Sequence, residues 1–464
     1  MFCFYTLFKE HKRFLVFLFI LSLITRFLFY FLFLKNNTCI LMFDSGHYHS
    51  VATQITRGLG VTNLDGTLHF YRLPGYPFFL ALIYKFFGID ISYVLYIQIF
   101  VYSFIPILIF LLVFLFFTES SQESEPGCQP VMLPKEQLKT AMCASIISCF
   151  DIGYLIFSGL IMSEMFFVLF FILFLIFFWR NSFIISGLLL GCASLVRPVG
   201  GPLIVCVLLC VIIFVKDKRI INLLKLFISW ACVISIWLIR NYIHTGLFFL
   251  HTLSGPHFVN HMAIRLVMSN YNLSYSEAKN YVYNVCDNKF RDKEKALKRA
   301  LTLPERSFIQ ESCAYKFMFL SPIKTVKFFL MNIIKTVFSL YSSELLVIDS
   351  GGKLPEYKKD LDVENIIKKF LFPSVNNKLI IFIIYLEIFI FIFFILGIFG
   401  FLISFYHEIY FVKVFLVFLI FSTLFVTLSL ACGFARLRLP IEVFLIMLAS
   451  RFWSKVFFRE KDAV

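Results

Sequence analysis

The sequence predicts an all-α protein: a polytopic membrane bundle of about 10–11 transmembrane helices with external juxtamembrane helices. Three observations predict it. Of the 464 residues, 60% are hydrophobic, the mean hydropathy is +0.86, and the apolar residues fall in long runs separated by short polar connections. A soluble domain is about half apolar, so the excess must face lipid. We expect a single integral-membrane domain over residues 1–464.

The charge and the cysteines exclude other classes. A formal net charge of +15 would suggest nucleic-acid binding in a soluble protein. Here lysine and arginine lie in short clusters between apolar runs, which is typical of loops retained in the cytoplasm, so we expect no nucleic-acid partner. The 12 cysteines include no CxxC pair and lie mostly in apolar segments. They predict small core residues, neither a disulfide framework nor a zinc site.

The first apolar run, 14–34, is long enough to span a membrane and too long for a signal peptide. The basic cluster at 9–13 precedes it and places the N-terminus in the cytoplasm. Residues 35–91 therefore form the first external loop, in which 76–88 predicts a juxtamembrane helix too short to cross.

Further apolar runs predict the other spans. They are 93–117, 140–158, 163–179, 183–196, 198–215, 222–239, 378–404, 411–430 and 439–453. Asp151 lies inside one run, so either a partner neutralises it or the run bends there. Residues 323–345 are apolar but carry lysines, so this segment could span the membrane or lie along its interface.

The charges between the runs set the sidedness. Counting spans places Glu164 and Arg197 outside and Arg180 and 216–219 inside, and the positive-inside bias agrees at both cytoplasmic turns. The polar stretch 240–322 predicts a long external loop with short helices and not a separately folding domain. No soluble domain is expected at the C-terminus.

A polar passage at 43–88 interrupts the apolar runs at the outer face. Asp44, Tyr48 and Ala52 are spaced i, i+4 and i+8 and share one face of a short helix. A carboxylate at a helix start is favoured by the unpaired amides of the first turn, so Asp44 could simply be an N-cap. The hexapeptide RLPGYP (72–77) predicts a rigid turn that orients the next helix.

A second carboxylate and several arginines lie on the same face. Glu164, in GLIMSE, could also be a dipole-capping acid with Ser163 as N-cap. Two acids at one outer edge could share a metal, or divide the roles of base and acceptor-orienting group. Any single arginine could snorkel to the interface, but paired guanidinium donors together favour an anionic lipid headgroup. The arginines are Arg72, Arg197, Arg240, Arg436 and Arg438.

Five short motifs follow one another along the chain. They are the passage from Asp44 to RLPGYP, SEMF at 163–166, GLLLGCASLVRP at 187–198, WLIRNY at 237–242 followed by Gly246, and RLRLP at 436–440. Together they resemble the GT-C membrane glycosyltransferases, in the family-39-type branch of protein O-mannosyltransferases and the lipid A aminoarabinose transferase.

The resemblance implies an inverting glycosyltransferase that moves a sugar from a polyprenyl-phosphate donor to a hydroxyl or amine at the outer face. Asp44 would be the catalytic base, Glu164 the second active-site acid, and the five arginines would bind the donor phosphate. The substrate pocket would include Tyr48, Tyr76, Asn241 and Tyr242. The partners would be the donor, membrane lipids and a lipid, glycan or protein acceptor. Mg²⁺ or Mn²⁺ could bridge Asp44 or Glu164 to the phosphate, although the spacing does not imply it.

One departure leaves the acceptor open, because those relatives carry a soluble C-terminal or inserted domain that this sequence lacks. The short loops and the missing domain favour a bacterial inner membrane with a periplasmic site, or the ER membrane in a eukaryote.

Two alternatives and one weaker site stay open. A transporter or flippase of lipid-linked sugars would show internal repeats and midplane charges. An O-antigen ligase or polymerase would share the external face but use an oligosaccharide diphosphate. His257 and His261, at i and i+4, are a candidate metal pair without a third ligand.

Overall fold

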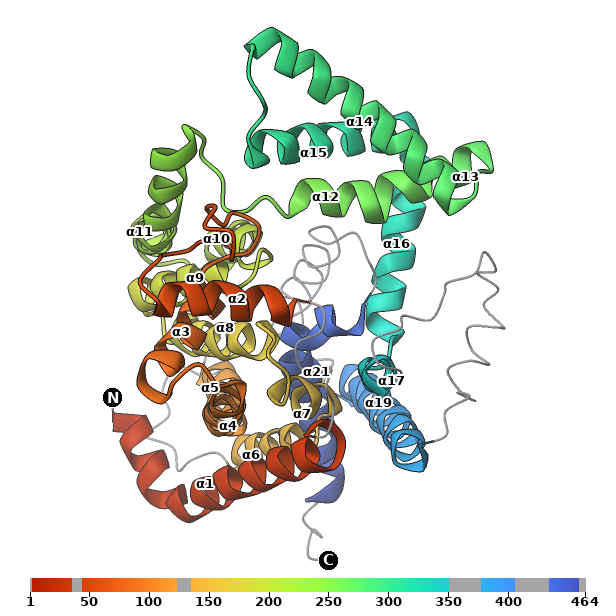
Figure 1. Ribbon diagram of the computed structural model, residues 1–464. Coiled ribbons are helices and arrows are strands. Elements are labelled where there is room, and N and C mark those ends of the chain that lie inside the picture. Colours follow the sequence, from red (N-terminus) through yellow and green to blue (C-terminus); the bar gives the residue numbers. More distant parts are fainter. Residues whose placement is uncertain (1, 36–43, 123–134, 350–376, 405–433, 459–464) are drawn as a thin grey trace, which may run out of the picture.

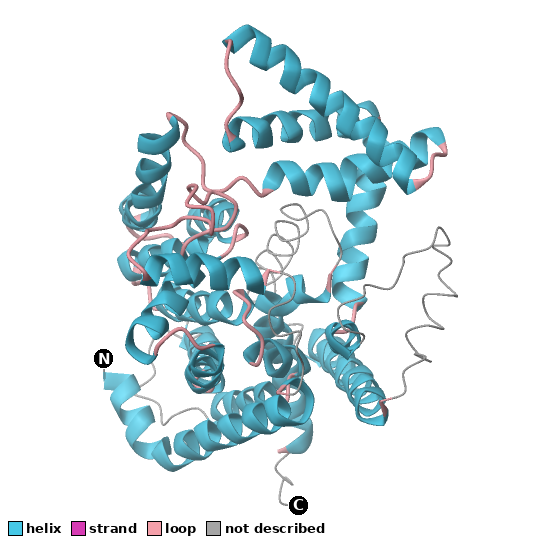
Figure 2. Cartoon of the chain, viewed as in Figure 1, coloured by secondary structure: helices cyan, strands magenta, loops and turns pink. Residues whose placement is uncertain are grey.

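The computed structural model is a bundle of helices from which a smaller helical unit projects (Figure 1). It describes residues 2–35, 44–122, 135–349, 377–404 and 434–458. These described residues contain helices and loops without a strand, and an isolated antiparallel bridge joins Thr62 to Leu68 (Figure 2). The predicted all-α bundle is confirmed at this level.

The first part of the bundle follows the predicted runs. Its elements are α1 (Phe2–Phe29), the π-helix η1 (Tyr30–Leu34), α2 (Ser45–Thr56), α3 (Gly75–Phe87), α4 (Ile91–Tyr102), α5 (Ile105–Gln122), α6 (Lys135–Cys149) and α7 (Ile152–Ser158). The axes of α6 and α7 differ by 51°. Asp151 N-caps α7 by accepting a hydrogen bond from the Tyr154 amide at 2.8 Å. Of the two alternatives stated for Asp151, neutralisation by a partner or a bend in the apolar run, the structure shows the bend.

The remaining described elements complete the bundle and the projecting unit. They are α8 (Glu164–Trp179), α9 (Phe183–Val196), α10 (Gly200–Phe214), α11 (Arg219–Thr245), α12 (Ser254–Phe258), η3 (Val259–Ala263), α13 (Ile264–Tyr271), α14 (Tyr275–Leu297), α15 (Leu303–Leu320), α16 (Pro322–Phe338), α17 (Ser342–Asp349), α19 (Lys378–Ser404), η5 (Ala435–Arg438) and α21 (Leu439–Phe457). The predicted span 411–430 lies outside the described residues.

Four helices are long and apolar enough to cross a membrane, and up to six are if each of two bent pairs counts as one span. This number, which covers the described residues alone, is below the about 10–11 predicted. Length accounts for three of the missing spans, because α8, α9 and α10 are apolar but have only 14–16 residues. The second bent pair, α15 and α16, turns by 107°, so both alternatives for 323–345 stay open.

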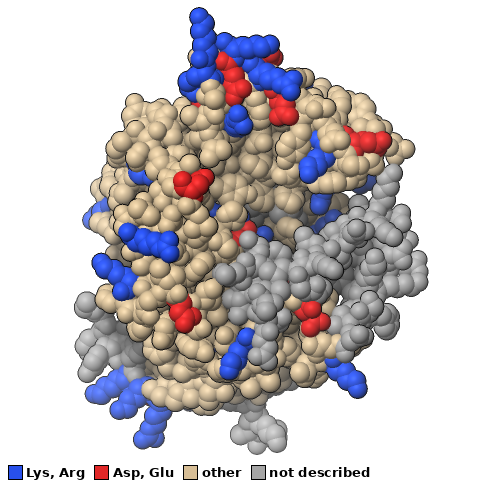
Figure 3. Space-filling model, in the orientation of Figure 1, with Lys and Arg blue, Asp and Glu red and all other residues tan. Residues whose placement is uncertain are grey.

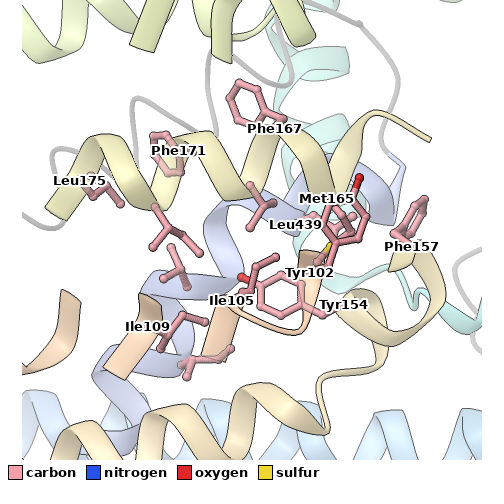
Figure 4. Packing of buried hydrophobic residues seen from close by; sticks show 14 of the residues in the cluster. Tyr102, Ile105, Ile109, Tyr154, Phe157, Met165, Phe167, Phe171, Leu175 and Leu439 are labelled. Atoms are coloured by element: carbon pink, nitrogen blue, oxygen red, sulfur yellow. The ribbon is translucent and has the colours of Figure 1, made fainter. Parts of the chain in front are cut away.

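Aromatic side chains of α4, α7 and α8 fill the centre of the bundle. Tyr102, Tyr154, Phe167 and Phe171 are each at most 1% exposed. Figure 4 shows Tyr102, Tyr154 and Met165 close to one another where these helices meet. Fully burying one such side chain contributes about 1.5–3 kcal/mol, so this core fixes the helix ends on which the site is built.

Helices α9 and α11 pack closely because glycine lies at their contact. A Cβ on Gly187 would overlap the carbonyl oxygen of Leu226 and lie 2.8 Å from Ser229 Cβ. We expect Gly187→Ala to destabilise the protein by about 1–3 kcal/mol, the usual cost of overpacking. The measurement is the thermal unfolding midpoint in detergent. Gly201→Ala is the matched control, since its Cβ would meet only Leu250 Cδ1 at 3.5 Å, and equal midpoints would contradict the prediction.

The stretch predicted as a long external loop is largely helical. Its longest helix, α14, has 23 residues, so the helices are longer than expected. This unit, α12–α15, has a hydrophobic cluster of its own, which includes Val259, Leu266, Val282 and Phe317. Charged side chains gather over its far end, at the top of Figure 3. The unit projects from the bundle, and the loop before α12 joins it to α11 (Figure 1).

Candidate functional site

Six separate segments of the chain line one pocket. The space between their atoms, including the opening to solvent, is about 600 Å³. Its polar lining residues are Asp44, Tyr48, Arg72, Ser163, Glu164, Arg197, His257 and Arg436. Its apolar lining residues are Pro198, Val199, Leu253, Leu437 and Pro440. Both predicted acids and three of the five predicted arginines therefore come together.

Asp44 lies at the start of α2 but makes no side-chain cap hydrogen bond. Its carboxylate instead forms an ion pair with Arg72 through Oδ1, and Oδ2 lies 3.5 Å from Nη1 of Arg436. Burial alone would raise the pKa of the Asp44 carboxyl. Arg436, then Arg72 and Arg197, outweigh burial, so this pKa lies below its usual value. Asp44 is therefore an ionised carboxylate held between guanidinium groups.

Glu164 starts α8, where Ser163 makes no side-chain cap hydrogen bond. Its Oε1 pairs with Nη1 of Arg197 at 2.6 Å, and the Glu164 side chain is only 2% exposed. Arg197 ends α9 in an extended conformation, as expected for a residue before proline, and so leaves the helix axis. The second oxygen of Glu164, Oε2, is buried without a hydrogen-bond partner among the described residues.

Side-chain contacts between α2 and the turn before α8 bring the two acids to one edge. The Tyr48 hydroxyl and Ser163 Oγ lie 3.0 Å apart, and Ser45 Oγ donates to Met162 Sδ at 3.6 Å. Tyr48 is 5% exposed, so the contact is part of the packed core. The predicted pocket residue Tyr48 thus lies in the lining and also connects the two elements.

The loop that precedes α3 places Arg72. Its backbone amide donates to His69 Nε2 at 2.9 Å, and His69 Nδ1 lies 2.7 Å from Asn63 Oδ1. Burial lowers the pKa of His69 to about 4, so this imidazole is neutral and can accept the hydrogen bond. Nε of Arg72 is buried without a partner in the described part of the chain.

Arg240 lies outside the pocket lining. It donates to the carbonyl oxygens of Val61 at 3.0 Å and His69 at 3.2 Å, and its guanidinium lies over the rings of Phe70 and Trp237. Because these carbonyls belong to the loop that carries Arg72, Arg240 holds that loop in place. Its contacts make it a positioning residue here.

Three predicted substrate-pocket residues also lie outside the lining. Tyr76 is fully buried and donates to Gln98 Oε1 at 3.0 Å. Asn241 donates to the carbonyl oxygen of Phe249 at 2.7 Å, and Tyr242 stacks on Phe248 at the surface. Each has a structural partner that accounts for its position.

Arg436 and Arg438 sit on one short 3-10 turn, η5, but reach different surroundings. Arg436 faces Asp44, whereas Arg438 pairs with Glu442 at 2.6 Å and donates to the carbonyl oxygen of Ser339 at 3.0 Å. Arg438 is 4% exposed and absent from the pocket lining. Arg438 thus ties the start of α21 to the end of α16.

One lining residue, His257, and one neighbouring glutamate outside the lining, Glu344, were not assigned to this site from the sequence. His257 lines the pocket, and burial, then His261 and Arg72, lower its pKa to about 3, so the imidazole is neutral. The i, i+4 spacing of His257 and His261 was the sequence signal for this position. In the structure the two imidazole rings stack with their centroids 4.9 Å apart. Glu344 had no signal; burial raises its pKa, and it interacts electrostatically with Arg436, Glu164 and Asp44.

The acids fit Mg²⁺ or Mn²⁺ poorly. Three of their four oxygens face guanidinium groups, and the described residues contain no group of three or more His, Cys, Asp or Glu side chains arranged to hold a metal. The arginines thus supply the positive charge that a divalent cation would bring to a phosphate.

Comparisons with known proteins add no family to this geometry. No protein-family model, curated protein or solved structure matches the chain. The resemblance to GT-C glycosyltransferases therefore stays a prediction.

Proposed function

We propose that the chain spans a membrane and is an inverting glycosyltransferase that moves a sugar from a polyprenyl-phosphate donor to a hydroxyl or amine at the outer face. The observation that carries the proposal is the pocket in which Asp44 and Glu164 meet Arg72, Arg197 and Arg436. Such a convergence of distant carboxylates and guanidiniums provides a base and an anion site together.

The ends of the helices support this sidedness. Helices α8, α9, α10 and α21 each reach the pocket with one end. Their opposite ends lie beside basic residues: Arg180, Lys216 and Lys455. Basic residues are retained in the cytoplasm, which favours the outer face for the pocket and agrees with the basic cluster at 9–13 ahead of the first span.

The phosphate and the prenyl chain of the donor match the charged and the apolar residues of the pocket lining, respectively. Three arginines against two carboxylates leave the pocket with one net positive charge, since His257 is neutral. A phosphate monoanion or dianion is attracted to this excess, and planar guanidiniums bind its oxygens through paired donors. The apolar wall of Leu253, Leu437 and Val199 suits the adjoining prenyl chain.

Asp44 then acts as the base. The acceptor oxygen or nitrogen attacks the anomeric carbon, its proton passes to Asp44, and the bond from that carbon to the phosphate oxygen breaks. The electron pair stays on the phosphate, where arginine stabilises it, so no strong general acid is required. In the free enzyme the arginines hold the pKa of Asp44 below its usual value, so Asp44 is a weak base. A bound phosphate adds negative charge beside it and raises its pKa toward that of an effective base.

A panel of labelled donors tests the proposal. The purified full chain, reconstituted in nanodiscs, is given polyprenyl-phosphate monosaccharides, each labelled in the sugar, with a mixed lipid, glycan and peptide acceptor fraction. We expect label from a monophosphate donor to enter the acceptor with inversion. Transfer only from oligosaccharide diphosphates would instead support a ligase or polymerase, and sugar movement across liposomes without bond cleavage would support a flippase.

A further inference from the structure

The projecting unit contains two cysteines that the site does not use. In the stretch 254–320, Cys286 lies on α14 and Cys313 on α15. Both are fully buried in the cluster of this unit, whereas most of the described cysteines lie in the apolar bundle. The pair therefore differs from the others in its surroundings as well as its place in the chain.

The hairpin geometry places the two thiols opposite each other. Helices α14 and α15 pack together and are joined by residues 298–302, so they form an antiparallel αα-hairpin. Cys286 lies eleven residues before the end of α14 and Cys313 ten residues after the start of α15. Both side chains are buried in the same cluster between the two helices, and the two thiols influence each other electrostatically. Ala314 is buried beside them, and so small a neighbour lets two helices approach closely.

We infer that Cys286 and Cys313 form a disulfide bond that fastens α14 to α15. The inference rests on the outer-face location given under the proposed function, and not on the sugar transfer itself. External compartments maintain disulfides, whereas the cytosol keeps thiols reduced. Two buried cysteines at matching positions of packed antiparallel helices need little backbone movement to reach disulfide geometry.

The bond forms by exchange with an external disulfide, carried by a thiol oxidoreductase or a small oxidised thiol. The neighbouring Cys286, and then the Lys289 ammonium, lower the pKa of the Cys313 thiol and so favour its thiolate. The Cys313 thiolate attacks the external disulfide and releases one thiolate. The Cys286 thiolate then attacks the Cys313 sulfur and releases the second thiolate. Two protons leave the protein, and its two electrons reduce the external disulfide. Because both side chains are buried afterwards, exchange takes place while the unit folds.

The bond would stabilise the unit that supplies His257 to the pocket. On α15, Ser307 donates to the carbonyl oxygen of Thr252 at 2.8 Å, and Glu311 accepts from Ser254 at 3.1 Å. These contacts fix the start of α12, on which His257 lies. Fastening α15 to α14 therefore restrains the wall of the pocket that the bundle itself does not build.

Peptide mapping tests the inference. Membranes containing the full chain are denatured in excess N-ethylmaleimide, which alkylates free thiols, and the protein is digested without reductant. We expect a linked peptide pair that contains Cys286 and Cys313, with Cys206 and Cys210 alkylated as internal controls. Alkylation of both Cys286 and Cys313 would overturn the inference, even if an added oxidant could then join them. The labelled-sugar assay on the same preparation reports the proposed function separately.

A variant series adds a second readout. Cys286→Ser and Cys313→Ser should each abolish the linked pair and lower the ratio of folded to unfolded unit by at least about tenfold, because the unfolded chain is no longer constrained. Protease cleavage within 254–320 measures this ratio. Dithiothreitol should have the same effect on the unmodified protein, and Cys210→Ser, a buried cysteine of α10, should have none. A cleavage rate unaffected by dithiothreitol would contradict the bond.

Discussion

Replacing Asp44 by Asn should lower the rate of sugar transfer by about 10²–10⁴-fold, the usual contribution of a general base. Asn keeps the shape of the side chain but cannot accept a proton from the acceptor. Donor binding should be retained or improved, because the phosphate no longer competes with the Asp44 carboxylate for Arg72 and Arg436. The measurements are single-turnover transfer and equilibrium binding of a labelled donor.

Asp65→Asn is the matched control for this variant. Asp65 lies in the same external passage, accepts from the Thr67 amide at 2.9 Å and lies outside the pocket lining. We expect Asp65→Asn to transfer sugar at the rate of the unmodified chain. Full turnover by Asp44→Asn would remove Asp44 from the mechanism, whereas loss of both binding and transfer would assign it a structural role.

The bundle and the edge where the two acids lie were largely predictable. Run length and the residues at run ends are local properties, so the helices carrying Asp44 and Glu164 followed from apolar periodicity and their polar starts. The bend at Asp151 was one of two stated alternatives, since a buried carboxylate is satisfied by the amides of a new helix start. These features depend on residues that are neighbours in the sequence, and for that reason they could be predicted from the sequence.

The directions of the arginine side chains were not predictable. Arg436 and Arg438 are two residues apart, yet one reaches the pocket and the other is buried against Glu442. The 3-10 turn that carries both arginines is not marked by any periodic pattern. Arg240 looked equivalent to Arg197, but backbone carbonyls of a loop about 170 residues earlier accept its donors. Such contacts depend on tertiary structure.

Replacing Arg197 by Gln should destabilise the protein by about 3–5 kcal/mol, because it leaves the nearly buried carboxylate of Glu164 without its ion-pair partner. Arg299→Gln is the matched control. Arg299 pairs with Glu305 at 2.7 Å but is 51% exposed, so water screens the pair and its loss should leave the unfolding midpoint almost unchanged. Thermal unfolding midpoints in one detergent measure both. Equal midpoints for the two variants would mean that the Glu164 pair is not formed.

The double variant Glu164→Gln/Arg197→Gln separates stability from chemistry. Two neutral amides of similar size can hydrogen-bond to each other, so the midpoint should return most of the way to that of the unmodified protein. Sugar transfer should not return with it, because one phosphate-binding guanidinium and one pocket acid are both absent. A stable double variant with full transfer would reduce the pair to a structural contact and leave Asp44, Arg72 and Arg436 as the reacting centre.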